Sequence, residues 1–198
     1  MARRDFTLFC SALLCFCSAT STLATPSDEL VHKLDAQVLR VQVARSNGGY
    51  GLGSLVVIAK DQVITNCHVV ANSSSIVMIN NGITLSSSAI KTDWHHDLCI
   101  LKVTGLDAPI AKIGSSKNLK YEQSVFTIGH PNFVEMPVST FGAVKGLFPF
   151  DDSVTIRASR TFGLGASGGS VFDDGNLVGV IMLKSPGREA YDYNMPVE

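Results

Sequence analysis

The chain has 198 residues, of which 45% are apolar and 17% charged, so it contains ample material for a hydrophobic core. This composition excludes a disordered chain, and the formal net charge of −1 comes without any basic run or acidic block. We therefore expect a globular protein that has no nucleic-acid partner.

The first 24 residues have the features of a secretion signal. Arg3 and Arg4 precede an apolar stretch from Phe6 to Ala19, which is short for a membrane span. Thr22-Leu23-Ala24 then places small residues at positions −3 and −1 of a cleavage site. We expect residues 1–24 to be a signal peptide, so that the mature protein is secreted or periplasmic and has no membrane attachment. An uncleaved anchor is the alternative.

From Val38 onward, short apolar runs alternate with turn signals, and helical periodicity is nearly absent. Asn80-Asn81-Gly82 between two apolar runs is a strong hairpin signal. The predicted strands are 38–43, 53–59, 63–65, 76–79, 83–85, 98–103, 124–128, 138–147, 154–158, 170–173 and 177–183, and 28–37 is a predicted short helix. This pattern indicates an all-β barrel or sandwich with antiparallel strands.

The stretch GLGASGGSVFD, from Gly163 to Asp173, places Ser167 among glycines. A serine hydroxyl becomes a good nucleophile when a base removes its proton and backbone N–H groups hold the resulting oxyanion. Upstream, VITNCHVV contains His68 and WHHDLCILKV contains Asp97. A histidine that takes the serine proton and an aspartate that orients the histidine would complete a catalytic triad.

The order of the three residues discriminates between the known kinds of triad. GASGG also fits the G-x-S-x-G turn of α/β-hydrolases, but that fold needs a histidine after the serine, and the last histidine here is His130. The subtilisin order would use Asp35 or Asp61, in an α/β fold that this sequence does not predict. The order His68, Asp97, Ser167 is that of chymotrypsin.

TNCHVV, HHDLCIL and GLGASGGSVFD resemble the three catalytic blocks of the trypsin-like serine peptidases, most closely those of the bacterial HtrA-like branch. VFTIGHPNF and YNMPV resemble the segments that open and close the second half of that domain. The resemblance implies two six-stranded antiparallel β-barrels with the active site in the cleft between them. We expect the barrels at residues 25–116 and 117–198, and we expect no PDZ domain in this chain.

The resemblance also implies roles for individual residues. Ser167 would attack the scissile carbonyl of a polypeptide substrate, His68 would act as general base, and Asp97 would orient His68. The N–H groups of Gly165 and Ser167 would form the oxyanion hole, and neither a metal nor an organic cofactor is needed. A catalytically silent binding module and an esterase on the same triad are the alternatives.

Two cysteines follow the expected signal peptide. Cys67 directly precedes His68, and Cys99 lies two residues after Asp97. If the histidine and the aspartate touch, these cysteines lie close enough to form a disulfide in an oxidising compartment. Two buried free thiols are the alternative.

The resemblance places Thr161 at the base of the primary specificity pocket and Lys184 at its rim. Because Thr161 carries no charge, a buried basic side chain would lack a counter-ion there. We expect the pocket to prefer apolar residues, then acidic ones, and to disfavour basic ones.

The remaining histidines have less specific interpretations. We expect adjacent His95 and His96 to lie in an exposed loop rather than to bind a metal, because no third ligand has suitable spacing. We expect His130, which precedes a proline, to shape a turn. Asp93 is the rival of Asp97 as the orienting aspartate, and the family pattern favours Asp97.

Overall fold

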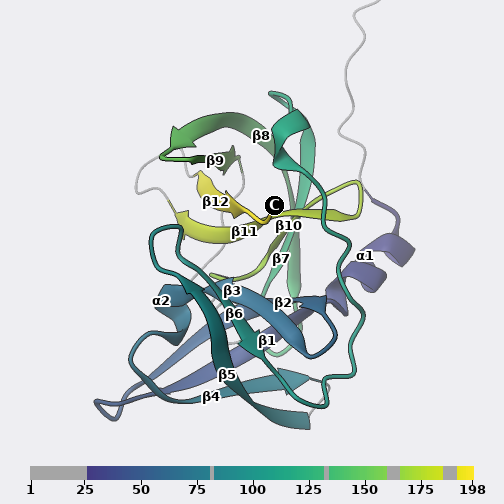
Figure 1. Cartoon of the computed structure of the whole chain (residues 1–198). Coiled ribbons are helices and arrows are strands. Elements are labelled where there is room, and N and C mark those ends of the chain that lie inside the picture. The colour runs from purple at the N-terminus through teal and green to yellow at the C-terminus, as the bar shows by residue number, and fades with distance from the viewer. Residues whose placement is uncertain (1–25, 81–82, 132–133, 160–165, 185–190) are drawn as a thin grey trace, which may run out of the picture.

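The computed structural model describes residues 26–80, 83–131, 134–159, 166–184 and 191–198. These residues form two closed antiparallel barrels of six strands each, with few residues in helices. Figure 1 shows the first barrel, in purple to teal, below the second, in green to yellow. The expected all-β, two-barrel fold class is thus confirmed.

The first barrel closes in the strand order β1-β2-β3-β6-β5-β4. Its strands are β1 (Val38–Arg45), β2 (Tyr50–Ala59), β3 (Gln62–Asn66), β4 (Ser73–Asn80), β5 (Ile83–Asp93) and β6 (Leu98–Lys102). The predicted hairpin is present, since Asn80 pairs with Ile83 at the end of the β4–β5 ladder. The inward-facing side chains of the first barrel are mostly β-branched or otherwise aliphatic, and they form a separate hydrophobic core.

The second barrel closes in the order β10-β11-β12-β9-β8-β7. Its strands are β7 (Ser124–Gly129), β8 (Val138–Phe150), β9 (Ser153–Ala158), β10 (Ser170–Asp173), β11 (Asn176–Lys184) and β12 (Asp192–Pro196). Strand β12 was not among the predicted strands, although its residues belong to the segment that resembles the end of the family domain. A separate cluster of buried side chains fills this barrel.

A third hydrophobic cluster lies where the barrels meet, and it contains residues of both. The helix α1 (Asp28–Asp35) joins this cluster through Leu34, which is 2% exposed. The side chain of Ser27 caps the helix by accepting a hydrogen bond from the amide of Leu30. The predicted short helix is therefore present, and it binds the two barrels together.

The connection between the barrels runs from the end of β6 at Lys102 to the start of β7 at Ser124. A short 3-10 helix, η1 (Ser116–Asn118), lies within it, and the carboxylate of Glu198 accepts hydrogen bonds from Ser116. The boundary that we expect between residues 116 and 117 falls inside this connection. Among the described residues, no helix is long and apolar enough to cross a membrane.

Candidate active site

His68 and Asp97 meet because β3 and β6 are neighbours. The one-turn helix α2 (Cys67–Val70) follows β3 directly, and β6 begins one residue after Asp97. Asn66 pairs with Leu98 at the end of the β3–β6 ladder. The carbonyl oxygen of Asp97 accepts hydrogen bonds from the amide of Cys67 and from the side chain of Asn66, both at 3.1 Å. The backbone of Asp97 is thereby fixed against the N-terminal end of α2.

The carboxylate of Asp97 binds His68 twice. One oxygen lies 2.6 Å from the ring Nδ1, and the other accepts a 2.8 Å hydrogen bond from the backbone amide. Because a carboxylate is an acceptor, the ring must donate from Nδ1, which leaves Nε2 of the neutral imidazole free to accept a proton. The His68 side chain is 47% exposed and that of Asp97 is 21% exposed. A substrate can therefore reach the histidine while the aspartate stays partly shielded from water.

The predicted disulfide between Cys67 and Cys99 is present, with a Cα–Cα distance of 4.9 Å. Cys99 pairs with Thr65 in the β3–β6 ladder, so the bond joins the start of α2 to β6. It lies within two residues of both His68 and Asp97. The covalent link therefore reinforces the part of the backbone that holds these two side chains together.

Ser167 lies in a tight turn between the barrels. The amide of Gly169 donates to the carbonyl of Ala166 at 2.9 Å, and Gly168 adopts φ +84°. The carbonyl of Ser167 accepts a 2.8 Å hydrogen bond from the amide of Ser54, in β2 of the first barrel. The turn therefore belongs to the second barrel but is held by the first.

Two glycines allow this close approach. A Cβ atom on Gly168 would overlap the carbonyl oxygen of Ser54 and the hydroxyl of Thr65. A Cβ atom on Gly53 would lie 2.5 Å from Val69 Cγ1 and 3.2 Å from the carbonyl oxygen of Ser167. The side chain of Val69, which follows His68, and the backbone of Ser167 thus approach the same point of β2.

The other predicted site residues are placed less fully. Gly165 and Thr161 lie outside the described residues. Lys184 is the last residue of β11, opposite Asp192 of β12. The oxyanion hole and the specificity pocket accordingly stay predictions.

The two candidate aspartates have different partners. The carboxylate of Asp93 binds His96, with 2.8 Å between Oδ2 and Nδ1, whereas that of Asp97 binds His68. His95 is exposed and contacts Asp151. No cluster of three or more ligating side chains suitable for a metal ion occurs in the described part of the chain.

His130 is buried at the junction of the barrels. Its ring nitrogens lie 3.4 Å from the carbonyl oxygens of Val134 and Val38, the latter in the first barrel. Burial lowers the pKa of this imidazole, and the nearby Arg40 acts in the same direction, while the carbonyl contacts oppose the shift. His130 therefore spans the turn after β7, and burial favours its neutral form.

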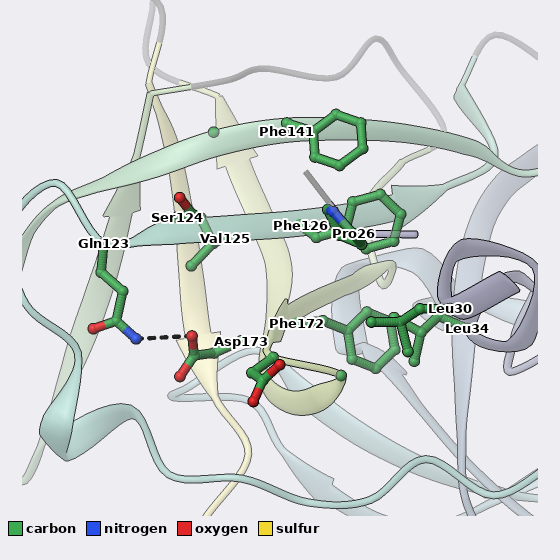
Figure 2. Close-up of a pocket in the computed structure, with 13 residues that line it drawn as sticks. Pro26, Leu30, Leu34, Gln123, Ser124, Val125, Phe126, Phe141, Phe172 and Asp173 are labelled. Carbon is green, nitrogen blue, oxygen red and sulfur yellow. Dashed lines mark hydrogen bonds between the residues drawn. The ribbon is translucent and has the colours of Figure 1, made fainter. Parts of the chain in front are cut away.

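A separate apolar pocket of about 440 Å³ lies between α1 and the second barrel (Figure 2). Its apolar lining comes from Pro26, Leu30, Leu34, Phe126, Phe141 and Phe172. At one end, the side chain of Gln123 donates a 2.8 Å hydrogen bond to Asp173. None of the proposed catalytic residues lines this pocket, so its contents would not take part in the chemistry at Ser167.

The two barrels, with a His–Asp pair on one and a glycine-flanked serine on the other, define a peptidase domain of the chymotrypsin fold. The family model for the trypsin-like peptidase domain matches residues 53–180, and the chain belongs to that family. A "probable periplasmic serine endoprotease DegP-like" of Pseudomonas fulva is 33% identical over 172 residues. A protein of the same description from Halomonas elongata is 31% identical over 156 residues. These matches cover 79% and 74% of this chain, which spans only 36% and 33% of the relatives' length.

Solved structures share the fold. The HtrA-type protease AlgW with a tripeptide aligns with a TM-score of 0.79 and 22% identity, over 87% of this chain and 60% of that one. The Rv3671c protease from M. tuberculosis, in its active form, aligns with a TM-score of 0.75 and 22% identity, over 94% and 90%. The expected likeness to the trypsin-like family and to its HtrA-like members is confirmed.

Proposed function

We propose that the protein is a secreted serine endopeptidase that works through an acyl-enzyme intermediate. The observation that carries the proposal is the pair of contacts between Asp97 and His68. They direct the free ring nitrogen of His68 away from Asp97. Family membership and the serine endoproteases among the relatives support the same activity.

In the proposed reaction, Nε2 of His68 takes the proton of the Ser167 hydroxyl as Oγ attacks the scissile carbonyl carbon. His68 then gives this proton to the leaving amine, and the first product departs with a new N-terminus. Water attacks the acyl-enzyme with His68 again as base, which releases the acid and restores the serine. Asp97 holds the ring and stabilises the imidazolium, and the N–H groups of Gly165 and Ser167 hold the oxyanion.

The proposed substrate is a polypeptide, in line with the peptide ligands named for the AlgW structures. The proposed location is the periplasm or the exterior, after cleavage of a signal behind Ala24. The periplasmic location in the relatives' descriptions and the Cys67–Cys99 bond support this location, because disulfides persist in oxidising compartments. For the residue before the cleaved bond we propose the order apolar, acidic, basic.

The direct test is hydrolysis of an unfolded protein and of a small ester by the mature protein, with Ser167→Ala as the control. Cleavage of both substrates by the wild type and of neither by the variant supports the proposal. Cleavage of the ester alone would make the protein an esterase. Cleavage of neither by the wild type would leave a silent binding module and overturn the proposed activity.

A further inference from the structure

Two histidine–aspartate contacts cross from one barrel to the other beside the proposed site. In the connection between β5 and β6, Nε2 of His95 contacts Oδ2 of Asp151. Nε2 of His96 lies 3.0 Å from Oδ1 of Asp152. Both aspartates form the turn between β8 and β9, in the second barrel.

An aromatic ring supports these polar contacts. The ring of Phe150 stacks on His95 with 5.6 Å between centroids, and His96 meets it edge-on at 5.8 Å. Aromatic pairs at this spacing contribute beyond the area that they bury. Phe150 is the last residue of β8, so the apolar and the polar contacts come from the same end of the hairpin.

Asp93, the last residue of β5, forms hydrogen bonds with both histidines from within the first barrel. One of its carboxylate oxygens accepts from the amides of both His95 and His96, each at 3.1 Å. The other oxygen lies 2.8 Å from Nδ1 of His96. The His96 ring, with a side chain only 16% exposed, therefore lies between the carboxylates of Asp93 and Asp152.

This arrangement requires the charged form of His96. A neutral imidazole has one N–H, and when Nδ1 donates it to Asp93, Nε2 presents a lone pair. A lone pair 3.0 Å from a carboxylate oxygen is repelled. The 3.0 Å contact between Nε2 and Asp152 is therefore attractive only when both ring nitrogens carry a proton. Only protonated His96 satisfies both neighbours.

We propose that His95 and His96, together with Asp151 and Asp152, form a protonation-dependent clasp between the barrels. The ionisable groups that face the histidines are Asp93 from their own side and the two aspartates from the opposite turn. The two imidazole rings also face each other edge-on, with 4.9 Å between centroids. The clasp is closed when His96 is protonated and the carboxylates are ionised.

The pKa values of the clasp residues set the pH range over which it closes. The hydrogen bond to Asp93 raises the pKa of His96 above its usual range, and the charges of Asp93 and Asp152 act in the same direction. A raised pKa means that the stabilisation by His96 is complete at low pH and is lost as the pH rises through the raised value. The pKa of Asp93 is lowered, chiefly by hydrogen bonds from His96, so its stabilisation persists until the pH falls through that lowered value.

The position of the clasp gives it a consequence for the site, which rests on the proposed function. His96 directly precedes Asp97, whose carboxylate binds His68, and Ser167 belongs to the second barrel. The clasp therefore acts on the placement of the base relative to the nucleophile. Because Asp152 is 86% and His95 61% exposed, each pair adds little to global stability, and the effect is one of local positioning.

The clasp itself is tested by the titration of the imidazoles, followed by ¹H–¹⁵N NMR on the mature protein. The variant Asp151→Asn/Asp152→Asn removes both carboxylate charges, and asparagine tolerates the φ of 49° at position 151. Glu122→Gln is the matched control, since it removes the exposed Lys145–Glu122 pair of the same barrel. Far-UV circular dichroism verifies that each variant is folded.

We expect the titration midpoint of His96 to fall in the double variant and to stay unchanged in Glu122→Gln. A His96 midpoint equal to that of the wild type would overturn the clasp. This arm needs no catalytic activity, so it decides the clasp even if the proposed function fails.

The positioning role is tested by kcat/KM across pH. We expect the double variant to lose on the order of tenfold at acidic and neutral pH, less than the ~10²-fold cost of a 1 Å misplacement. The loss should vanish at alkaline pH, where the clasp of the wild type is open as well. Shifted midpoints with parallel pH profiles of wild type and variant would overturn the positioning role.

Discussion

The amide of Ser54 donates a 2.8 Å hydrogen bond to the carbonyl of Ser167, and so the first barrel holds the proposed nucleophile of the second. The Ser54 hydroxyl accepts from the amide of His130 at 2.9 Å, and its carbonyl accepts from the hydroxyl of Thr65 at 2.8 Å. Ser54 is completely buried. Through these three hydrogen bonds, Ser54 of β2 connects the turn of Ser167 with Thr65 of β3 and with His130, the residue after β7.

The close contact between Ser54 and the turn of Ser167 predicts that Gly168→Ala abolishes activity. The added methyl group would overlap the Ser54 carbonyl and the Thr65 hydroxyl, which displaces the turn of Ser167. Gly105→Ala is a matched control, because Gly105 has a similar φ of +80° and nothing within 4 Å of a Cβ atom. We expect the control to lose only the cost of an unfavourable φ, about 1–2 kcal/mol of stability. Equal stability and equal kcat in the two variants would contradict the close approach.

The proposed triad predicts a large, non-additive loss of catalysis. Ser167→Ala or His68→Ala should each lower kcat by roughly 10⁴- to 10⁶-fold, and the double variant should be scarcely worse. Asp97→Asn should cost about 10⁴-fold, because the amide no longer selects the productive tautomer of His68. Asp93→Asn, which changes the rival aspartate, should cost far less. Steady-state kinetics on a peptide substrate measure all five variants, and a loss for Asp93→Asn as large as that for Asp97→Asn would contradict the assignment.

The disulfide predicts a stability loss close to the site. Cys67→Ala/Cys99→Ala removes a link between residues 32 apart in sequence, which by the chain-entropy relation costs about 3–4 kcal/mol. Urea denaturation with and without reductant measures it, since the variant should not respond to reductant whereas the wild type should. A loss below about 1 kcal/mol would mean that the backbone hydrogen bonds alone fix His68 and Asp97.

Buried His130 predicts a loss of stability on acidification. Its pKa is lowered by burial, so the unfolded chain takes up a proton before the folded chain does, and stability falls as the pH falls below the ordinary histidine range. One such group contributes at most about 1.4 kcal/mol per pH unit. His130→Gln should flatten the dependence of the unfolding free energy between about pH 7 and pH 5. Unchanged slopes in His130→Gln would refute this explanation.

The sequence predicted the barrels well where apolar alternation and turn residues mark the strands. It underestimated β5, predicted over 83–85 but extending to Asp93, because its outer residues are serine-rich and exposed. That strand is fixed by ladders with β4 and β6, which no local pattern reveals. The helix α2 was not predicted either, since Cys67–Val70 continues a run typical of a strand.

In the site as well, local sequence motifs were recognised, whereas contacts between residues distant in sequence were not. Side chains in ordered motifs, such as His68 and Asp97, could be found from sequence. The contact between Ser54 and Ser167 could not be found from sequence, because this hydrogen bond is made by backbone atoms that any residue supplies. The clasp was missed because Asp151 and Asp152 lie far from His95 and His96 in sequence, and each pair alone has the appearance of exposed loop residues.

The most direct test of the central claim is labelling of the mature protein with a fluorophosphonate, followed by intact mass and peptide mapping. An activated serine reacts with this probe, whereas an ordinary serine does not. We predict one adduct, on Ser167, that is absent from Ser167→Ala and strongly reduced in His68→Ala. No adduct on the wild type, or labelling that persists unchanged in His68→Ala, would contradict a serine activated by this histidine.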